Sequence, residues 1–525
     1  MSLVPFILVT FGGAAATLLT RRWPRVSIST GLGALLLGAL AGMLIQPGDI
    51  MSVGDGALVG SAYVRLFGVT GTIAGALLCI LALATTWQRN LPGSLLAILG
   101  SSVVALSMPE PTVAVIAALA GGLAGVLVTI VAPVTGRSVA IAARELRAIS
   151  IAGALAIVAT AWVARPLGPI EAQPVLLGLA YLGFALAVAV RFGAIPFHAW
   201  AARLSDSAPE PALPFLMAWG PATLGIVALA WVGSAVVPFA EPLGLERGLV
   251  LAVAGATLLL GAFAAWIQDD VEHIVGYSIV QDAGFVLLAL AALDPRAWEP
   301  AREWVIAFVL AKSAFAGWAV AVRTAFGTRR VPELGGWARR SPLLGLALLA
   351  IAVASIGWPG LAVWEARGTL VDLAIDGPLE AVVALGALAS VAYYARLLAV
   401  GMGRPSPAVI AGSRSWLQRP RREFTRARRS LAAGDTGGRA ARIDGARSRV
   451  GGWTDTLGPV WRLNRTPIAA AIVLALSLSG LAVAAGGFGV AEAARAPAPQ
   501  AGATTPSAAP SPLPSAEPSP EPSVP

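Results

Sequence analysis

Residues 302–323, REWVIAFVLAKSAFAGWAVAVR, decide the fold, because a long apolar stretch here encloses one charged side chain, Lys312. A helix of about 20 apolar residues crosses a hydrocarbon core of about 30 Å. The whole chain has a similar composition, with 57% hydrophobic and 12% charged residues among 525. Soluble proteins carry about 25% charged residues. The sequence therefore predicts an all-α, polytopic integral membrane protein.

Hydropathy predicts about fourteen transmembrane helices. Residues 302–323 form the eleventh of them. The other predicted spans are 4–19, 28–46, 57–86, 92–107, 111–133, 147–165, 173–194, 210–236, 246–268, 273–293, 341–375, 379–401 and 466–488. Basic residues follow the first span rather than precede it, which predicts a retained helix and not a secretory signal.

Two of the predicted spans are expected to be interrupted. Pro214 and Pro221 fall in the eighth span, and Gly357, Pro359 and Gly360 fall in the twelfth. Proline removes a helical hydrogen bond, and backbone freed at membrane depth is tolerated mainly beside protein or a water-filled cavity. Such breaks are typical of ion-translocating proteins.

The predicted spans divide the chain into four parts. Residues 1–401 form a transmembrane domain of thirteen predicted helices, and residues 466–490 contain the last one. Residues 402–465 carry fourteen arginines, which predicts a cytoplasmic loop against anionic headgroups or a docking surface for a partner subunit. Residues 491–525 are rich in Pro, Ala and Ser and are expected to be a disordered tail.

The charges of the predicted loops indicate the orientation. Loops after odd-numbered spans carry arginines such as Arg21, Arg89 and Arg203, whereas loops after even-numbered spans run acidic. One exception is the acidic sequence DDVEH at 269–273, on the basic side. The positive-inside rule then predicts a multi-pass protein of the cell membrane with both termini outside.

Ionisable residues within a span are functional candidates, because a charge at mid-bilayer costs about 2.5–3.5 kcal/mol even on a lenient scale. The candidates for a proton path lie within a predicted span or at its end. They are Arg191, His198, Asp282, Lys312, Glu365 and Arg367.

Lys312 is the most informative candidate, as it is the single lysine among 37 basic Lys and Arg residues. Burial can draw the pKa of a lysine toward neutrality, whereas a guanidinium stays charged. The alternative is a structural lysine that snorkels or pairs with Asp282 or Glu365. His198 suits proton uptake by its titration range, but a histidine at a helix end is as often a hydrogen-bonded structural residue.

Other classes of chemistry find no support in the sequence. One cysteine, Cys79, excludes an internal disulfide and a cysteine-based zinc or iron–sulfur site, and two histidines make a histidine-rich metal centre improbable. No phosphate-binding or dinucleotide-binding glycine motif occurs in a fitting context. We therefore expect no cofactor or metal in this chain and no nucleic-acid partner.

Several stretches, in order along the chain, resemble one known family. They are RFGAIPFHAW at 191–200, followed by Asp206 and APEP at 208–211, then QDDVEHIVGYS at 268–278, DAGF at 282–285, ELGG at 333–336, SIGWPGLAVWEAR at 355–367 and SVAYYAR at 390–396. These resemble the antiporter-like membrane subunits of respiratory complex I, with the subunit N type nearest. That family is related to Mrp-type antiporters and membrane-bound hydrogenase subunits. The resemblance covers residues 180–400 well.

The resemblance implies proton translocation along buried lysines and glutamates, driven by quinone reduction in partner subunits that carry quinone, flavin and iron–sulfur clusters. By position, the seventh-helix lysine of the family corresponds to Arg191, the twelfth-helix lysine to Arg367, and a lysine of some members to Lys312. The eighth-helix lysine falls at Pro221. The histidine of the family's HxGY motif is replaced by Asp282.

The fifth-helix glutamate of the family falls near Ala118 or Leu119, so it is absent too. These departures leave three hypotheses. The chain is a membrane-arm subunit that conducts protons by a modified path through Asp282, Lys312 and Glu365. Alternatively it is a non-conducting scaffold subunit of such a complex, or an Mrp-like cation/proton antiporter. In none of them is the chain a redox catalyst by itself.

Overall fold

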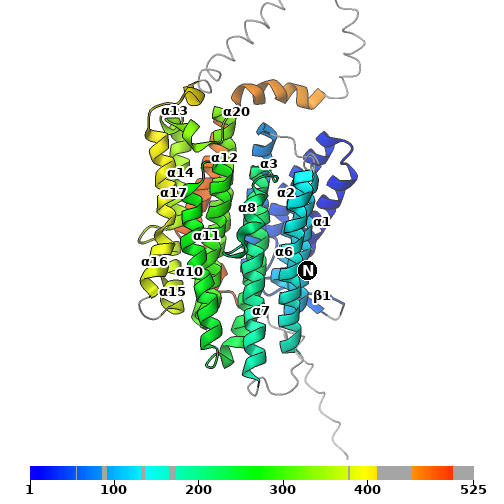
Figure 1. Cartoon of the computed structure of the whole chain (residues 1–525). Coiled ribbons are helices and arrows are strands. Elements are labelled where there is room, and N and C mark those ends of the chain that lie inside the picture. The colour runs from blue at the N-terminus through cyan, green and yellow to red at the C-terminus, as the bar shows by residue number, and fades with distance from the viewer. Residues whose placement is uncertain are drawn as a thin grey trace, which may run out of the picture.

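A computed structural model of the chain describes residues 1–54, 56–85, 91–131, 136–164, 173–375, 379–410 and 452–499. Long helices lie side by side in a bundle (Figure 1). A hairpin of β1 (Ile50–Val53) and β2 (Gly56–Val59) lies toward one end, and the short helix α13 (Trp337–Arg340) lies at the other. We call these the hairpin end and the α13 end.

The first half of the bundle contains seven helices. Their bounds are α1 Val4–Leu19, α2 Pro24–Met43, α3 Ala62–Thr85, α4 Leu91–Ser107, α5 Pro111–Val131, α6 Gly136–Ala164 and α7 Pro174–Phe192. Several begin at proline, which has no N–H to lose in the first turn. α7 ends at Gly193, whose positive φ of 66° forms a left-handed C-cap.

The second half alternates long helices with short helical turns. The turns are η2 Phe197–Ala199, η3 Glu210–Ala212, η4 Phe215–Trp219, η5 Val232–Val236, η6 Val237–Phe239, η7 Pro295–Ala297, η8 Val331–Leu334 and η10 Gly487–Gly489. The helices are α8 Ala201–Leu204, α9 Gly220–Trp231, α10 Gly244–Ile267, α11 Val271–Ala292, α12 Trp298–Phe326, α14 Pro342–Ile356, α15 Ala362–Ala374, α16 Leu379–Leu388, α17 Ser390–Met402, α20 Gly452–Ala484 and α21 Val490–Arg495.

The predicted all-α membrane architecture is confirmed apart from the hairpin. In the described residues, 10 helical segments are long and apolar enough to cross a membrane, and α1, α4 and α14 are shorter apolar helices. The count of about fourteen spans stays a prediction. Two boundaries move: α3 begins at Ala62 because residues 56–59 pair as a strand, and α6 begins at Gly136 rather than near residue 147.

The two expected interruptions are present. Residues 210–239 form a chain of short 3₁₀, π and α turns around α9 instead of one α-helix. α14 stops at Ile356 and α15 starts at Ala362, with Gly357 and Gly360 between them at positive φ values of 78° and 88°. Glycine adopts such angles without the steric cost that a Cβ would bring.

α12 forms the centre of the bundle. In its most apolar segment, 100% of the residues are buried. The corresponding share is 94% for α11 and 39% for α10. α12 packs against α3, α11, α14, α15 and α20. A residue in the middle of α12 is therefore shielded from lipid by protein on every side.

The C-terminal part is more ordered than the sequence suggests. α20 begins at Gly452, within the predicted loop, and α21 packs Val490 and Ala494 into the core at the start of the expected tail. Apolar residues at helical spacing in this short segment provide that packing. Residues 411–451 and 500–525 lie outside the described residues, so the expectations for them are untested.

The packing of α10 against α11 yields a stability prediction. A Cβ at Gly261 would lie 2.9 Å from the Gln281 Cα, whereas one at Gly248 on the same helix would meet no atom within 4 Å. We expect Gly261→Val to destabilise the protein by about 1–3 kcal/mol, because a packed helix interface cannot absorb extra volume. Thermal unfolding of the purified protein measures this, with Gly248→Val as control. Equal losses in the two variants would contradict the packing described here.

Candidate functional site

The single lysine forms an ion pair at the centre of the bundle. Lys312 Nζ on α12 lies 2.7 Å from Asp282 Oδ2 on α11, and the two side chains are 0% and 1% exposed. Within the described part of the chain, neither oxygen of Asp282 nor the Lys312 Nζ makes a hydrogen bond, so the contact is an ion pair by distance. Of the two partners that the sequence proposed for Lys312, the structure therefore brings Asp282 to it.

Two tyrosines of α17 surround this pair. The Lys312 Nζ lies 5.9 Å from the centre of the Tyr394 ring, and the Tyr394 hydroxyl donates a 3.0 Å hydrogen bond to Ser355 Oγ. The hydroxyl of the neighbouring Tyr393 donates to Gln281 Oε1 at 3.1 Å. Tyr394 thus contacts both Lys312, through its ring, and Ser355 in the last turn of α14 before the break, through its hydroxyl.

Arg367 on α15 binds the helix ends that the break creates. Its Nη1 donates to the carbonyls of Ser355, at 2.9 Å, and Ile356, and its Nη2 donates to the carbonyl of Ala387 near the end of α16. The last carbonyls of a helix lack partners and carry partial negative charge. The Arg367 guanidinium satisfies these groups, and it acts as a fixed positive charge.

Arg191 at the end of α7 has a comparable arrangement. Its Nη1 donates to the Leu216 carbonyl at 3.3 Å. Leu216 lies in the π turn η4, in which Gly220 N–H donates to the Phe215 carbonyl five residues earlier. The next bond of this pattern would join the Leu216 carbonyl to residue 221, but Pro221 has no N–H. Arg191 supplies the missing donor.

Glu145 on α6 is a buried carboxylate that the sequence analysis missed. It is fully buried and interacts electrostatically with Arg191. The sixth span was predicted to begin at residue 147, so Glu145 fell in the predicted loop before it. A signal was nevertheless present in the sequence, because the apolar residues Ala156, Ala152 and Ile149 recur at a helical spacing that continues to Glu145.

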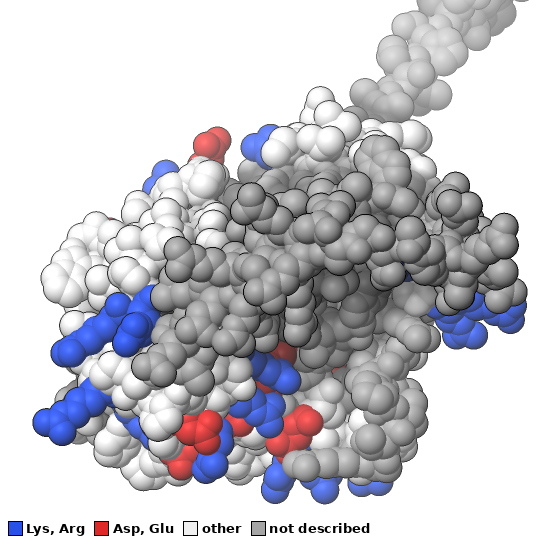
Figure 2. Space-filling model, turned by 90° about the horizontal axis from the view of Figure 1, so that it is seen from above, with Lys and Arg blue, Asp and Glu red and all other residues white. Residues whose placement is uncertain are grey.

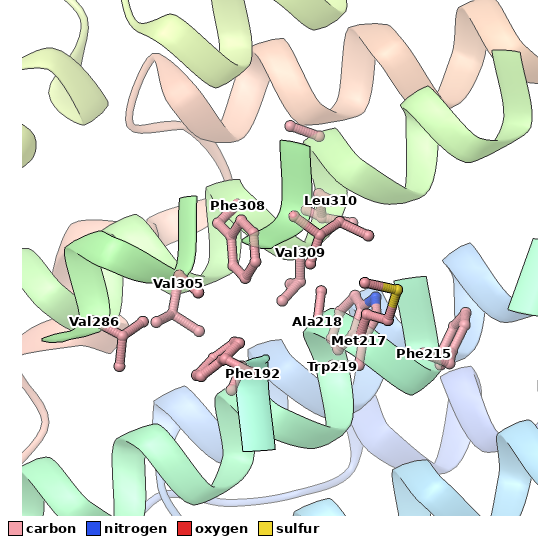
Figure 3. Close-up of a cluster of buried hydrophobic side chains, with 14 of the residues drawn as sticks. Phe192, Phe215, Met217, Ala218, Trp219, Val286, Val305, Phe308, Val309 and Leu310 are labelled. Atoms are coloured by element: carbon pink, nitrogen blue, oxygen red, sulfur yellow. The ribbon is translucent and has the colours of Figure 1, made fainter. Parts of the chain in front are cut away.

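An apolar cluster joins α7 and η4 to α12. Phe192 follows Arg191, Phe308 lies one helical turn before Lys312, and Trp219 lies between α7 and α12, as Figure 3 shows. The Phe192 and Phe308 ring centres are 6.3 Å apart, and Trp219 Nε1 donates to Ser313 Oγ at 3.1 Å.

Glu365 does not join the central pair. It is exposed on α15 and lines a cavity of about 540 Å³ together with Glu299 and Glu303. Glu303 is 8% exposed, and its Oε1 has no hydrogen-bond partner among the described residues. The expectation that Glu365 partners Lys312 is wrong for this conformation, since hydropathy does not reveal which face of a short helix points inward.

His198 lies in η2, after α7, and is half-buried. Its ring centre is 6.4 Å from that of Tyr277 on α11, and its Nδ1 has no hydrogen-bond partner in the described ranges. The structure thus leaves both the proton-uptake role and the structural role open to His198.

The acidic exception at 269–273 has a structural explanation. Arg329 on the loop after α12 contacts Glu272 at 2.5 Å and Asp270 at 2.8 Å, and Arg323 pairs with Glu210. Viewed from the α13 end, basic and acidic side chains lie next to each other (Figure 2). These acidic residues neutralise arginines, so they do not reverse the orientation that the other loops indicate.

Comparisons with known proteins identify a relationship for part of the chain. Residues 168–391 match the family model described as NADH:quinone oxidoreductase/Mrp antiporter, TM. NADH-quinone oxidoreductase subunit N of Salinispora tropica is 37% identical over 240 residues, which cover 42% of this chain and 45% of that protein. Subunit N 1 of Rhizobium meliloti is 27% identical over 258 residues, or 48% of this chain and 50% of that protein. The matches therefore span about half the length of these relatives.

Solved structures share the fold. A chain of respiratory complex I from Thermus thermophilus superposes with a TM-score of 0.61 at 19% identity, covering 78% of this chain and 95% of that one. For a chain of the Mrp complex from Dietzia sp. the TM-score is 0.64 at 21% identity. The superposition covers 79% of this chain and 49% of that one. For a chain of an archaeal membrane-bound sulfane sulfur reductase the TM-score is 0.65 at 15% sequence identity. The superposition covers 92% of this chain and 100% of that one. The resemblance inferred from the motifs is confirmed, and the chain is a multi-pass membrane protein.

The buried ion pair predicts a thermodynamic coupling. Lys312→Met or Asp282→Asn alone leaves an unpaired charge in the core and should cost about 3–5 kcal/mol. The double variant should lose clearly less than the sum of the two single losses, because neither charge remains. Unfolding of the purified variants measures the coupling. The exposed pair Arg296–Asp294 is the control and should couple weakly. Strictly additive losses for Lys312 and Asp282 would contradict the pair.

Proposed function

We propose that the chain is a membrane-arm subunit of a complex I-like, proton-translocating quinone oxidoreductase, and that the Lys312–Asp282 pair is its proton-exchanging centre. The observation that carries the proposal is this pair, which is fully buried on the two most buried candidate spans of the described residues, in a fold shared with such subunits. The match of residues 168–391 to the family supports the assignment.

A buried ion pair contributes little net stability, because the desolvation of both charges offsets their attraction. Its usefulness lies in protonation: a proton that moves from Lys312 Nζ to Asp282 Oδ2 leaves two neutral groups at the same site. Small changes in hydration or helix position shift the balance between the charged and the neutral pair. The lysine is required for this step, since an arginine would keep its proton.

Arg191 and Arg367 serve as fixed charges on either side of the pair in this proposal. Both bind backbone carbonyls left free by helix breaks. Each arginine also interacts electrostatically with a carboxylate, Arg191 with Glu145 and Arg367 with Asp282. They tune the proton carriers and do not release protons themselves.

Redox chemistry in this proposal belongs to partner subunits, which would hold quinone, flavin and iron–sulfur clusters. In the described residues, no group of three His, Cys, Asp or Glu side chains could hold a metal ion. The proposed orientation places both termini outside, with the arginine-rich residues 402–465 in the cytoplasm, where they face anionic headgroups or a partner subunit.

A second candidate function, a non-conducting scaffold subunit, is favoured by the apolar cluster around Phe192, Phe308 and Trp219 and by the proline at position 221. An Mrp-like antiporter is the third candidate, supported by the shared fold of the Mrp complex. Sodium-dependent proton flux from the isolated protein in liposomes would support the third and contradict the first.

The substitution Lys312→Arg tests the proposed function, because it keeps the positive charge beside Asp282 but prevents its loss at physiological pH. We expect the assembled complex to reduce quinone while its proton pumping per quinone falls at least about tenfold, as a barrier increase of 1.4 kcal/mol would produce. Pumping by the complex in liposomes is measured as acidification alongside quinone reduction.

The matched control is Arg247→Lys, the reverse exchange at a residue that binds the Ala291 carbonyl away from the central pair. It should leave the pumping ratio unchanged. Unchanged pumping in an assembled Lys312→Arg complex would favour the scaffold function. If Lys312→Arg prevents assembly, Asp282→Asn replaces it, because the amide cannot receive the lysine proton.

A further inference from the structure

A cavity of about 820 Å³ opens at the hairpin end of the bundle, apart from the central pair. Its wall comes from the ends of α3, α4, α9 and α12 and from residues 497–499 after α21. Apolar and aromatic groups predominate, among them Trp231 and Trp298. Ligand cavities in proteins have about this volume and this mainly apolar lining.

Arg302, in the second turn of α12, lines this cavity and is 3% exposed. Its guanidinium carbon lies 3.9 Å from the centre of the Tyr63 ring and 4.5 Å from that of Trp298. Nη1 donates to the carbonyls of Ala494, at 2.9 Å, and Ala496. Nε has no hydrogen-bond partner in the described part of the chain.

The acidic residues on the same wall already have partners. Glu110 accepts the backbone N–H of Thr112 at 3.0 Å and that of Val113 at 2.6 Å. Asp294 holds Arg296 at 2.7 Å, and these hydrogen bonds lower the pKa of the Asp294 carboxyl. Among the described residues, no carboxylate lies within ion-pair distance of Arg302.

Arg302 is therefore a buried cation without an acidic partner, which is costly unless a counter-charge compensates it. Arg367 provides the contrast. Among the described residues it also has no ion-pair partner, but its two terminal nitrogens donate to three carbonyls. Both hydrogen bonds from the Arg302 side chain to carbonyls come from Nη1, and the cavity that this residue lines has room for an anion and an apolar chain.

We propose that this cavity binds an anionic amphiphile, with a phosphate or carboxylate head against Arg302 and an apolar tail between α4 and the end of α9. Arginine presents several N–H donors that match the oxygens of such a head group. A position in the second turn of a membrane helix is also the depth at which lipid head groups lie. A phospholipid and free phosphate share the head-group chemistry, and the experiment separates them.

The test uses the full-length purified protein with three probes: phosphatidylglycerol, phosphatidylcholine and inorganic phosphate. Native mass spectrometry counts the retained molecules. We expect phosphatidylglycerol to be retained about tenfold more tightly than phosphatidylcholine, as one charge-assisted hydrogen bond would give. Phosphate alone should bind far more weakly. Arg302→Gln should abolish the preference, and the control Arg296→Gln, at an exposed paired arginine, should keep it.

A second variant tests the same cavity in case Arg302→Gln does not fold. Gly233 lines the cavity, and a Cβ there would meet no atom within 4 Å, so Gly233→Leu fills the space and leaves Arg302 intact. It should lower phosphatidylglycerol retention, whereas Gly248→Leu, at another open glycine, should not. Equal retention of the two lipids, an unchanged preference in both cavity variants, or phosphate binding as tight as lipid binding would overturn the proposal.

Discussion

The ion pair between Lys312 and Asp282 is the constraint on which the arrangement of this bundle depends. Two opposite charges at this depth are tolerated only when protein encloses them and their partners are fixed. Among the candidate membrane spans of the described residues, those of α11 and α12 are the most buried. The tyrosines of α17 and the end of α14 complete the enclosure, so the pair defines which helix faces turn inward.

The two helix breaks are stabilised by the same physical means. A broken helix at membrane depth exposes carbonyls that neither lipid nor the helix can satisfy. Arg191 donates to the carbonyl left free by Pro221, and Arg367 donates to the last carbonyls of α14. The resemblance described above implies lysines of the family at these two positions. Their structural task explains why a permanently charged, multidonor side chain is suited to each position.

The sequence predicted the broad architecture because it depends on composition and local pattern. The span around Lys312 and the break near Gly357 follow from apolar length and from glycine and proline chemistry. Glu145 and Arg302 were not recognised as candidates, and Glu365 was given Lys312 as one candidate partner, because the environment of each residue depends on which helices meet. The Asp282 pairing was one of two alternatives, and only the packing of α11 against α12 decided between them.

The apolar cluster between Phe192, Trp219 and Phe308 has a consequence for water. A proton moves between distant groups along hydrogen-bonded water, and a narrow apolar constriction excludes water until it widens. Hydration of this cluster is then a collective event in which several molecules enter together, because one water among aromatic rings finds too few hydrogen-bond partners. If the chain conducts protons as proposed, this cluster would be dry in the insulating state and wet in the conducting one, and the size of three aromatic side chains would set the threshold.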